Sequence, residues 1–225
     1  IKSGTKKDKI LVIQPFGRSV NQVGPAVYDA TSRSIESSNV VSIMEKLRTE
    51  YGILVMSQVP IDISENEDHP IAVPKESNLR LWAAMIHNAD HFLGCDSVGQ
   101  HIVKALNKTA TVVIGSTYPI NISYPDDKDF DIIDVGKDKR VYSPIRLTMD
   151  DERDRANNDC IVMDEKEIQL VVDSVKKRMG KGKKFEGTVE KHVHTNKCNH
   201  DDSSNYTKAS PVKIPEGLKL MEEQG

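Results

Sequence analysis

Apolar side chains in the first half of the chain fall into two alternating patterns, short continuous runs and stripes with helical spacing. The first continuous run, residues 9–14, is rich in β-branched side chains and is followed by Pro15. A run of this kind is typical of a strand buried on both faces of a sheet. Residues 53–56, 92–95 and 111–114 form similar runs and predict three further strands.

Stripes with helical spacing occupy the intervals between these runs. In residues 40–47 the apolar side chains stand at positions i, i+3, i+4 and i+7, and residues 79–86 repeat this spacing. We expect Ser77 to be the N-cap of the second of these helices. Residues 98–107 and 168–175 predict two more helices.

Residues 116–160 are acidic and rich in turn residues, and within them residues 130–135 predict an edge strand. Just beyond this region, Asp164 and Glu167 resemble a capping box, in which each residue satisfies a backbone N–H of the other. The helix expected over residues 168–175 therefore has a defined start.

Strands that alternate with helices predict a parallel sheet built from right-handed crossovers and covered on both faces. The predicted fold class is α/β, a doubly wound, Rossmann-like parallel sheet. Beyond residue 180 the sequence is dominated by small and polar residues and cannot bury enough apolar surface to order itself. We expect residues 1–8 to be a linker or truncated edge, residues 9–180 to form the domain, and residues 181–225 to be a disordered tail.

The charge balance narrows the possible functions. The 225 residues include 31 Lys and Arg against 34 Asp and Glu, a net charge of −3, which argues against a general nucleic-acid binder. No apolar run approaches the ~20 residues that span a membrane, and no signal peptide follows Ile1. Three scattered cysteines, Cys95, Cys160 and Cys198, make no disulfide framework. We therefore expect a reducing, cytoplasmic location.

Three segments should meet at the carboxyl edge of the predicted sheet, where open α/β folds bind ligands. They are residues 15–24, 96–101 and 115–125. In the second segment, Ser97 can cap the following helix and Gly99 leaves room for a ligand beside the backbone. The N–H groups at such a helix start attract phosphate, whereas Asp96 is better suited to a loop amide or a sugar hydroxyl. In the alternative interpretation, these polar residues only satisfy local backbone groups.

The second and third segments carry motifs in a recognisable order. Residues 96–101 read Asp-Ser-Val-Gly-Gln-His, and after a helix and a Val-rich strand residues 115–119 read Gly-Ser-Thr-Tyr-Pro. This order resembles the family 9 glycosyltransferases, the lipopolysaccharide heptosyltransferase group, in which Asp-Ser-Gly-x-x-His precedes a Gly-x-Thr-x-Pro turn. The resemblance covers about residues 8–178 and is weakest over residues 126–158.

The resemblance implies one half of a glycosyltransferase B fold, the C-terminal half that binds a nucleoside diphosphate sugar. Such an enzyme transfers a sugar, here a heptose or hexose, to a glycan or lipopolysaccharide-like acceptor, with inversion and without a metal or other cofactor. The acceptor site and the catalytic base would belong to an N-terminal domain, so that the enzyme is incomplete without it. The catalytic residues are therefore unknown from this sequence.

The resemblance also implies which side chains hold the donor. Counting back from Leu47 along its helix places Arg33 where the family often has a lysine, with Arg18 as the competing cation. Val98 stands where the family has glycine, and the acid that contacts the ribose has no clear match, Asp62 being the nearest. The implied donor-binding residues are Asp96, Ser97, Gly99, His101, Arg33, Arg18 and Thr117.

These departures favour an alternative function, a non-catalytic nucleotide- or glycan-binding module derived from the same fold. A dehydrogenase is disfavoured because no Gly-x-Gly-x-x-Gly follows the first predicted strand.

Cys95 is expected to be a small buried residue at a strand end rather than a nucleophile. Four potential zinc ligands crowd the polar tail, but their spacing matches no standard zinc finger, and we expect no metal site. They are His192, His194, Cys198 and His200.

Overall fold

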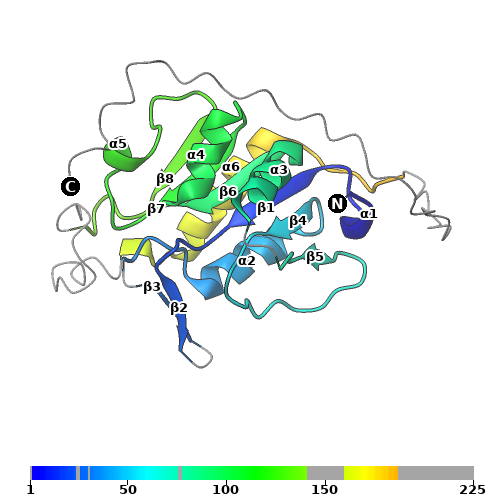
Figure 1. Ribbon diagram of the computed structural model, residues 1–225, viewed down its shortest axis with the longest axis horizontal. Coiled ribbons are helices and arrows are strands. Elements are labelled where there is room, and N and C mark those ends of the chain that lie inside the picture. Colours follow the sequence, from blue (N-terminus) through cyan, green and yellow to red (C-terminus); the bar gives the residue numbers. More distant parts are fainter. Residues whose placement is uncertain (1, 24–25, 30, 76–77, 141–159, 187–225) are drawn as a thin grey trace, which may run out of the picture. The chain divides into compact units, whose positions relative to one another are not determined.

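A six-stranded parallel sheet forms the centre of the protein (Figure 1). The computed structural model describes residues 2–23, 26–29, 31–75, 78–140 and 160–186. The strands are β1 (Ile10–Gln14), β4 (Gly52–Val55), β5 (Ile71–Ala72), β6 (His91–Cys95), β7 (Ala110–Ile114) and β8 (Phe130–Asp134). Their order is β5-β4-β1-β6-β7-β8, so the direction of winding reverses between β1 and β6. This order is that of a Rossmann fold and confirms the predicted doubly wound sheet.

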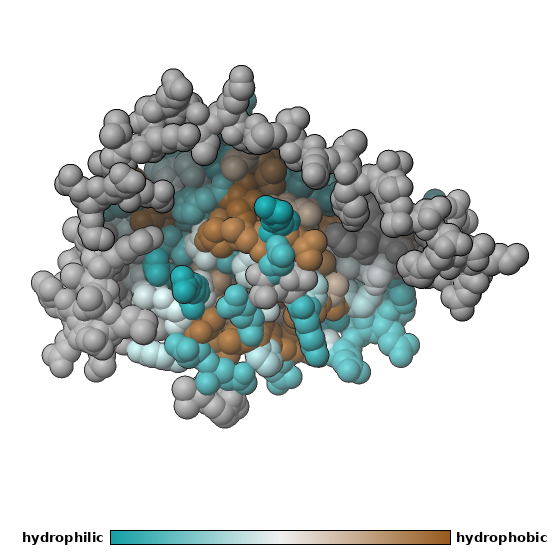
Figure 2. Space-filling model, in the orientation of Figure 1, coloured by the Kyte–Doolittle hydropathy of each residue, from teal (hydrophilic) through white to brown (hydrophobic). Residues whose placement is uncertain are grey.

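Two helices cover each face of the sheet. The helices α2 (Ser37–Leu47) and α6 (Glu165–Met179) pack in one core cluster with Leu11 and Ile13 of β1. The other cluster joins Ile10 and Val12 of the same strand with residues of α3 (Leu79–Asn88) and α4 (Val98–Ala105). Strand β1 is therefore buried on both faces, which explains its unbroken apolar sequence. Figure 2 shows apolar side chains toward the middle of one face, with polar side chains around them.

The helix starts follow the sequence closely, with one correction. Asp164 Oδ1 accepts a hydrogen bond from Glu167 N at 2.8 Å, and Asp164 N donates to Glu167 Oε2 at 2.9 Å, which confirms the capping box of α6. The prediction that Ser77 caps α3 was wrong. Asn78, the residue directly before the helix, is the N-cap, and its side chain accepts a hydrogen bond from Arg80 N at 2.9 Å.

A two-stranded antiparallel hairpin, β2 (Val20–Val23) and β3 (Ala26–Asp29), is inserted between β1 and α2 and was not predicted. Figure 1 shows it projecting away from the central sheet. The carboxylate of Asp29 closes its base, accepting hydrogen bonds from Thr31 N at 2.8 Å and Ser34 N at 3.0 Å. Two short helices, α1 (Lys2–Thr5) and α5 (Pro119–Ile122), complete the described elements.

Residues 181–186, which the sequence assigned to the tail, are hydrogen-bonded to the start of the domain. Lys7 and Lys184 form an antiparallel bridge, and Phe185 N donates to Lys6 O at 3.1 Å. These backbone bonds join residues far apart in the chain, so composition alone did not reveal them. The rest of the predicted tail, with the four potential zinc ligands, lies outside the described residues. Among the described residues, no helix is long and apolar enough to cross a membrane.

Candidate functional site

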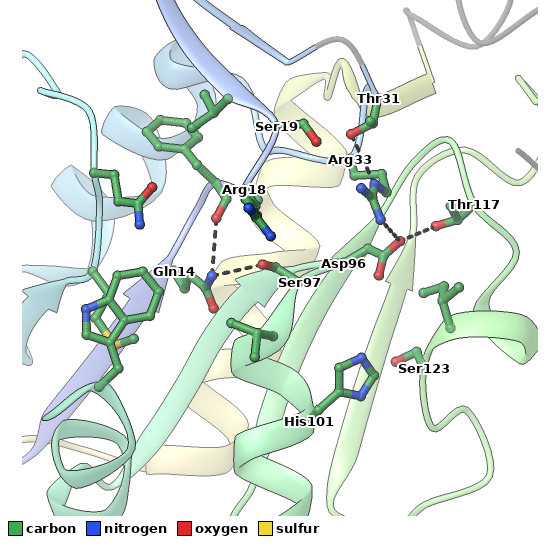
Figure 3. Close-up of a pocket in the computed structure, with 18 of the residues that line it drawn as sticks. Gln14, Arg18, Ser19, Thr31, Arg33, Asp96, Ser97, His101, Thr117 and Ser123 are labelled. Carbon is green, nitrogen blue, oxygen red and sulfur yellow. Dashed lines mark hydrogen bonds and ion pairs between the residues drawn. The ribbon is translucent and has the colours of Figure 1, made fainter. Parts of the chain in front are cut away.

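A cavity of about 1090 Å³ opens at the carboxyl edge of the sheet, beside the point where its winding reverses (Figure 3). Each wall begins where a strand ends. Gln14 is the last residue of β1, Met56 follows β4, Asp96 follows β6 and Thr117 lies in the turn after β7. This is the usual ligand position in an open α/β fold.

Six of the seven predicted donor-binding residues line this cavity. They are Arg18, Arg33, Asp96, Ser97, His101 and Thr117. Gly99 does not, and the prediction that it leaves room for a ligand was wrong. A Cβ atom on Gly99 would lie 2.1 Å from Gln14 Oε1 and 2.4 Å from Phe92 Cζ. The glycine therefore allows α4 to pack closely against the sheet, and protein side chains fill the predicted space.

Asp96 organises the polar wall of the cavity instead of offering a free carboxylate. It is 6% exposed, and its Oδ2 accepts a hydrogen bond from Thr117 Oγ1 at 3.0 Å. The same oxygen lies 3.9 Å from Nη1 of Arg33. Burial raises the pKa of Asp96, and the Arg33 guanidinium opposes that rise. The sequence predicted a bond to a loop amide or a sugar; the structure gives this carboxylate side-chain partners from two other loops.

The two arginines of the cavity are held differently. Arg33 donates from Nε to Thr31 Oγ1 at 3.0 Å, and that hydroxyl donates to Asp29 Oδ1 at 2.6 Å. With Asp96 on its other side, the Arg33 guanidinium is fixed at the cavity wall. Arg18 lines the cavity from the turn after β1 and forms no hydrogen bond or ion pair with any other described residue. The site thus combines one fixed cation with one that can follow a ligand.

The start of α4 faces the cavity without a side-chain cap. Ser97 occupies the N-cap position as expected, but its side chain caps nothing, so this part of the prediction was wrong. Its Oγ instead accepts a hydrogen bond from Gln14 Nε2 at 3.0 Å, because that amide reaches across from the end of β1. The orphan N–H groups of the first turn are left for an anion or for water.

His101 and Tyr124 form the wall of the cavity on the side of α5. His101 Nδ1 lies 2.9 Å from Tyr124 Oη, and the two rings meet edge to face at a centroid distance of 5.7 Å. Behind them, Gln100 Nε2 donates to Ile122 O at 3.0 Å and Ser123 Oγ donates to Gln100 Oε1 at 2.6 Å. These bonds hold the segment after β7 against α4.

Arg140 supports the same segment from outside the cavity. Its side chain is 1% exposed and donates to Thr117 O and to the Asp134 carboxylate, while the guanidinium lies 4.6 Å from the ring centroid of Tyr118. Sequence analysis did not predict this role, because Arg140 follows a region without clear periodicity. Gln14 was also missed, although a polar residue that ends an apolar strand at the carboxyl edge is a usable signal.

Part of the cavity lining is apolar. Phe16, Met56, Leu79 and Trp82 line it, from the loops after β1 and β4 and from the start of α3. The indole of Trp82 is mostly buried, whereas Leu79 is 55% exposed. The cavity lining therefore combines cationic and apolar side chains, which suits a ligand with a charged group and a flat ring.

Among the described residues, neither Cys95 nor a metal-binding cluster adds a further reactive group to the cavity. Cys95 is buried, and desolvation raises the pKa of its thiol far above the ordinary value, so it is no nucleophile near neutral pH. Within the described ranges, no group of three or more His, Cys, Asp or Glu side chains is arranged to hold a metal ion.

No protein-family model matches the chain, and no curated protein matches it. Several solved structures are similar. E. coli heptosyltransferase WaaC with ADP-2-deoxy-2-fluoro heptose is 15% identical over 57% of this chain, with a TM-score of 0.43. E. coli ADP-heptose LPS heptosyltransferase II is 10% identical over 76%, with a TM-score of 0.46. The iron-containing dodecameric glycosyltransferase TibC of enterotoxigenic E. coli is 13% identical over 75%, with a TM-score of 0.42.

The chain spans less than half of each of these proteins, 37%, 48% and 46% of their respective lengths. Similarity at this level assigns neither an activity nor a substrate.

Proposed function

We propose that the cavity binds a nucleoside diphosphate sugar, and that the chain is the donor-binding domain of a metal-independent, inverting glycosyltransferase. One observation carries this proposal: Arg18, Arg33 and the uncapped start of α4 converge on one cavity at the carboxyl edge of the sheet. The motif order over residues 96–119, which resembles the family 9 glycosyltransferases, supports the same conclusion.

The charges of the site suit a diphosphate leaving group. Such a group carries two or more negative charges, and one helix dipole supplies only about half a positive charge. Arg18 and Arg33 would supply the remainder without a divalent metal, since fixed cations stabilise charge that develops during the reaction. Asp96 would take part indirectly, because its bonds to Thr117 and Arg33 keep its own negative charge satisfied within the wall.

The apolar part of the cavity lining would hold the nucleobase. Trp82 and Met56 offer a flat and a polarizable surface there. A base placed there would put the diphosphate near α4 and the sugar near His101. His101 would then donate a hydrogen bond to a phosphate or sugar oxygen.

The sugar would be a heptose or hexose and the acceptor a glycan, as in the family that the sequence resembles. The general base would come from an N-terminal acceptor-binding domain. The alternative is a non-catalytic nucleotide- or glycan-binding module. It is favoured by Val98, whose side chain is 40% exposed at the start of α4, and by Ser57 and Gln58 after β4, where the family has an acid.

Isothermal titration of the whole chain with ADP tests the donor site. We expect equal affinity with Mg²⁺ and with excess EDTA, since the arginines replace the metal. Arg33→Ala should weaken binding by about 2–3 kcal/mol, because it removes a cation and leaves Asp96 facing the phosphates. Arg18→Ala should cost less. Lys166→Ala, which removes an exposed cation on α6 away from the cavity, is the control and should change nothing.

Four results would count against the proposal in different ways. Binding that requires Mg²⁺ would exclude the metal-free site. A loss confined to Arg18→Ala would show that Arg33 has only a structural role. Failure of ADP and of every other nucleoside diphosphate to bind would remove the donor site altogether. Binding without sugar transfer, when the chain is joined to its acceptor domain, would select the non-catalytic module.

A further inference from the structure

Two short segments at opposite ends of the described chain hold a large share of its positive charge. Residues 2–9 and 176–186 together contain ten Lys and Arg but only two acidic residues, Asp8 and Glu186. Because the whole chain has a net charge of −3, all the other residues together carry −11. The overall balance therefore conceals a strong separation of charge.

The fold brings these two segments together. The bridge between Lys7 and Lys184 is extended by a hydrogen bond from Asp8 N to Lys183 O at 3.1 Å. Lys9 Nζ donates to Met179 O at the end of α6, which ties the helix to the same place. In Figure 1 the orange segment after α6 runs beside α1, where β1 begins. We call residues 2–9 and 176–186 the basic surface.

Five lysines of the basic surface are exposed and form no salt bridge with a described carboxylate. They are Lys6, Lys177, Lys181, Lys183 and Lys184. Lys176 and Arg178 are paired with Glu50 and Asp131, and Lys7 donates to a main-chain carbonyl. The nearest acids do not neutralise the lysines: Asp8 accepts from Lys183 N, and Lys6 donates to the carbonyl of Glu67 rather than to its carboxylate.

The basic surface lies at the opposite edge of the sheet from the cavity. The strands of the sheet are parallel, and the cavity is built from the residues that follow their carboxyl ends. The basic surface instead joins the segment before β1 to the segment after α6, at the amino ends of the strands. A partner bound there would leave the cavity open.

We propose that the basic surface binds an anionic lipid bilayer. Lysines clustered near an anionic membrane are each attracted by its surface potential, and clusters of four to eight basic residues are typical of anionic-lipid recognition. A nucleic acid fits less well. Phe185, the one aromatic residue of these segments, is half-buried, so the basic surface presents no fully exposed ring on which a base could stack.

Co-sedimentation of the full chain with lipid vesicles tests this proposal. We compare vesicles of phosphatidylcholine alone with vesicles of phosphatidylcholine and phosphatidylglycerol in equal parts. The test variant replaces three lysines by glutamine: Lys181→Gln, Lys183→Gln and Lys184→Gln. The matched control makes the same charge change at three exposed lysines elsewhere: Lys75→Gln, Lys137→Gln and Lys166→Gln.

The wild-type chain should bind only the anionic vesicles, and binding should weaken as salt is added. The test variant should lose affinity on the order of 100-fold, and the control variant only a few-fold. Both variants should keep the wild-type melting temperature and ADP affinity, because none of these lysines lines the cavity.

Each contrary result is decisive. Equal losses in the two variants would mean that net charge, and not this surface, drives binding. Absence of wild-type binding to anionic vesicles, or tighter binding to polyuridylate than to those vesicles, would overturn the proposal. ADP binding is measured separately, so that failure of the basic surface and failure of the donor site are distinguishable.

Discussion

The two edges of the sheet use histidine in opposite ways. At the amino edge, both ring nitrogens of buried His91 are bonded, Nδ1 to Thr109 Oγ1 at 2.7 Å and Nε2 to Thr111 Oγ1 at 2.9 Å. The network continues through Ser174 to Asp131, which Arg178 holds at the surface. At the carboxyl edge, exposed His101 has one ring nitrogen on Tyr124 and borders the cavity.

This difference indicates that the amino edge of the sheet contributes to stability and the carboxyl edge to ligand binding. A buried polar network whose members are all satisfied fixes the elements that it joins, here β6, β7, β8 and α6. A polar wall with an uncapped helix and with Arg18, which has no partner among the described residues, keeps capacity for a ligand. Burial, with a smaller effect from Arg178, lowers the pKa of His91 to about 4, so this ring is neutral at physiological pH.

The largest effect on stability should come from replacing His91, whose two ring nitrogens are both hydrogen-bonded. His91→Ala leaves a cavity and unpaired threonine hydroxyls, and should lower the free energy of unfolding by about 3–4 kcal/mol. Urea denaturation measures this loss. The folded variant should bind ADP with unchanged affinity. His87→Ala, at an exposed position on α3, is the control and should cost less than about 0.5 kcal/mol. A loss of ADP affinity in His91→Ala would break the separation between the two edges.

His91 should also make the stability of the protein depend on pH. Its folded pKa is about 4, below the unfolded value of 6.5, so the unfolded chain takes up the proton first. The stability that neutral His91 provides is full above pH 6.5 and falls as the pH drops toward 4, by about 3 kcal/mol in total. Asp96, whose pKa burial raises, is protonated more readily in the folded chain and acts in the opposite direction.

Because other groups such as Asp96 also titrate, the effect of His91 is isolated by comparing the wild type with a variant that lacks this ring. We expect the urea midpoint of the wild type to fall between pH 6.5 and 4.5 relative to that of His91→Leu, in which the titrating ring is absent. Parallel pH profiles for the two chains would show that His91 does not titrate in this range.

The smallest effect on stability should come from replacing His101, the exposed histidine that borders the cavity. His101→Ala should weaken ADP binding by about 1–3 kcal/mol, as for a lost hydrogen bond to a charged group, and change stability by less than about 1 kcal/mol. Tyr124→Phe should act in the same direction, because its hydroxyl orients the ring. In the His101→Ala background, Tyr124→Phe should have no further effect on titration with ADP. Lost stability with unchanged affinity would make His101 a structural residue.

Much of the fold could be predicted because local pattern and tertiary environment agree. An apolar run such as Ile10–Gln14 is buried on both faces only in a covered parallel sheet, and the helices between the strands supply the cover. Parallel strands also place their following residues at one edge, which is why Asp96 and Thr117 were expected together and lie 3.0 Å apart.

The errors concern contacts between residues distant in sequence. Ser97 was expected to cap its own helix, but Gln14, from another strand, takes its hydroxyl. The space expected over Gly99 is filled by the side chains of Gln14 and Phe92, which nothing near Gly99 in the sequence could reveal. The support that Arg140 gives to Thr117 is of the same kind.

The pairing of residues 6–8 with residues 183–185 has a consequence for the architecture as a whole. A domain whose first and last described segments adjoin can be circularly permuted without changing any strand neighbour. A short linker would join the segment after Phe185 to α1, and new ends would open at Asn107, an exposed turn residue with a φ of 53°. By the same geometry, the domain could be inserted whole into a loop of another protein, with both connections leaving from the edge remote from the cavity.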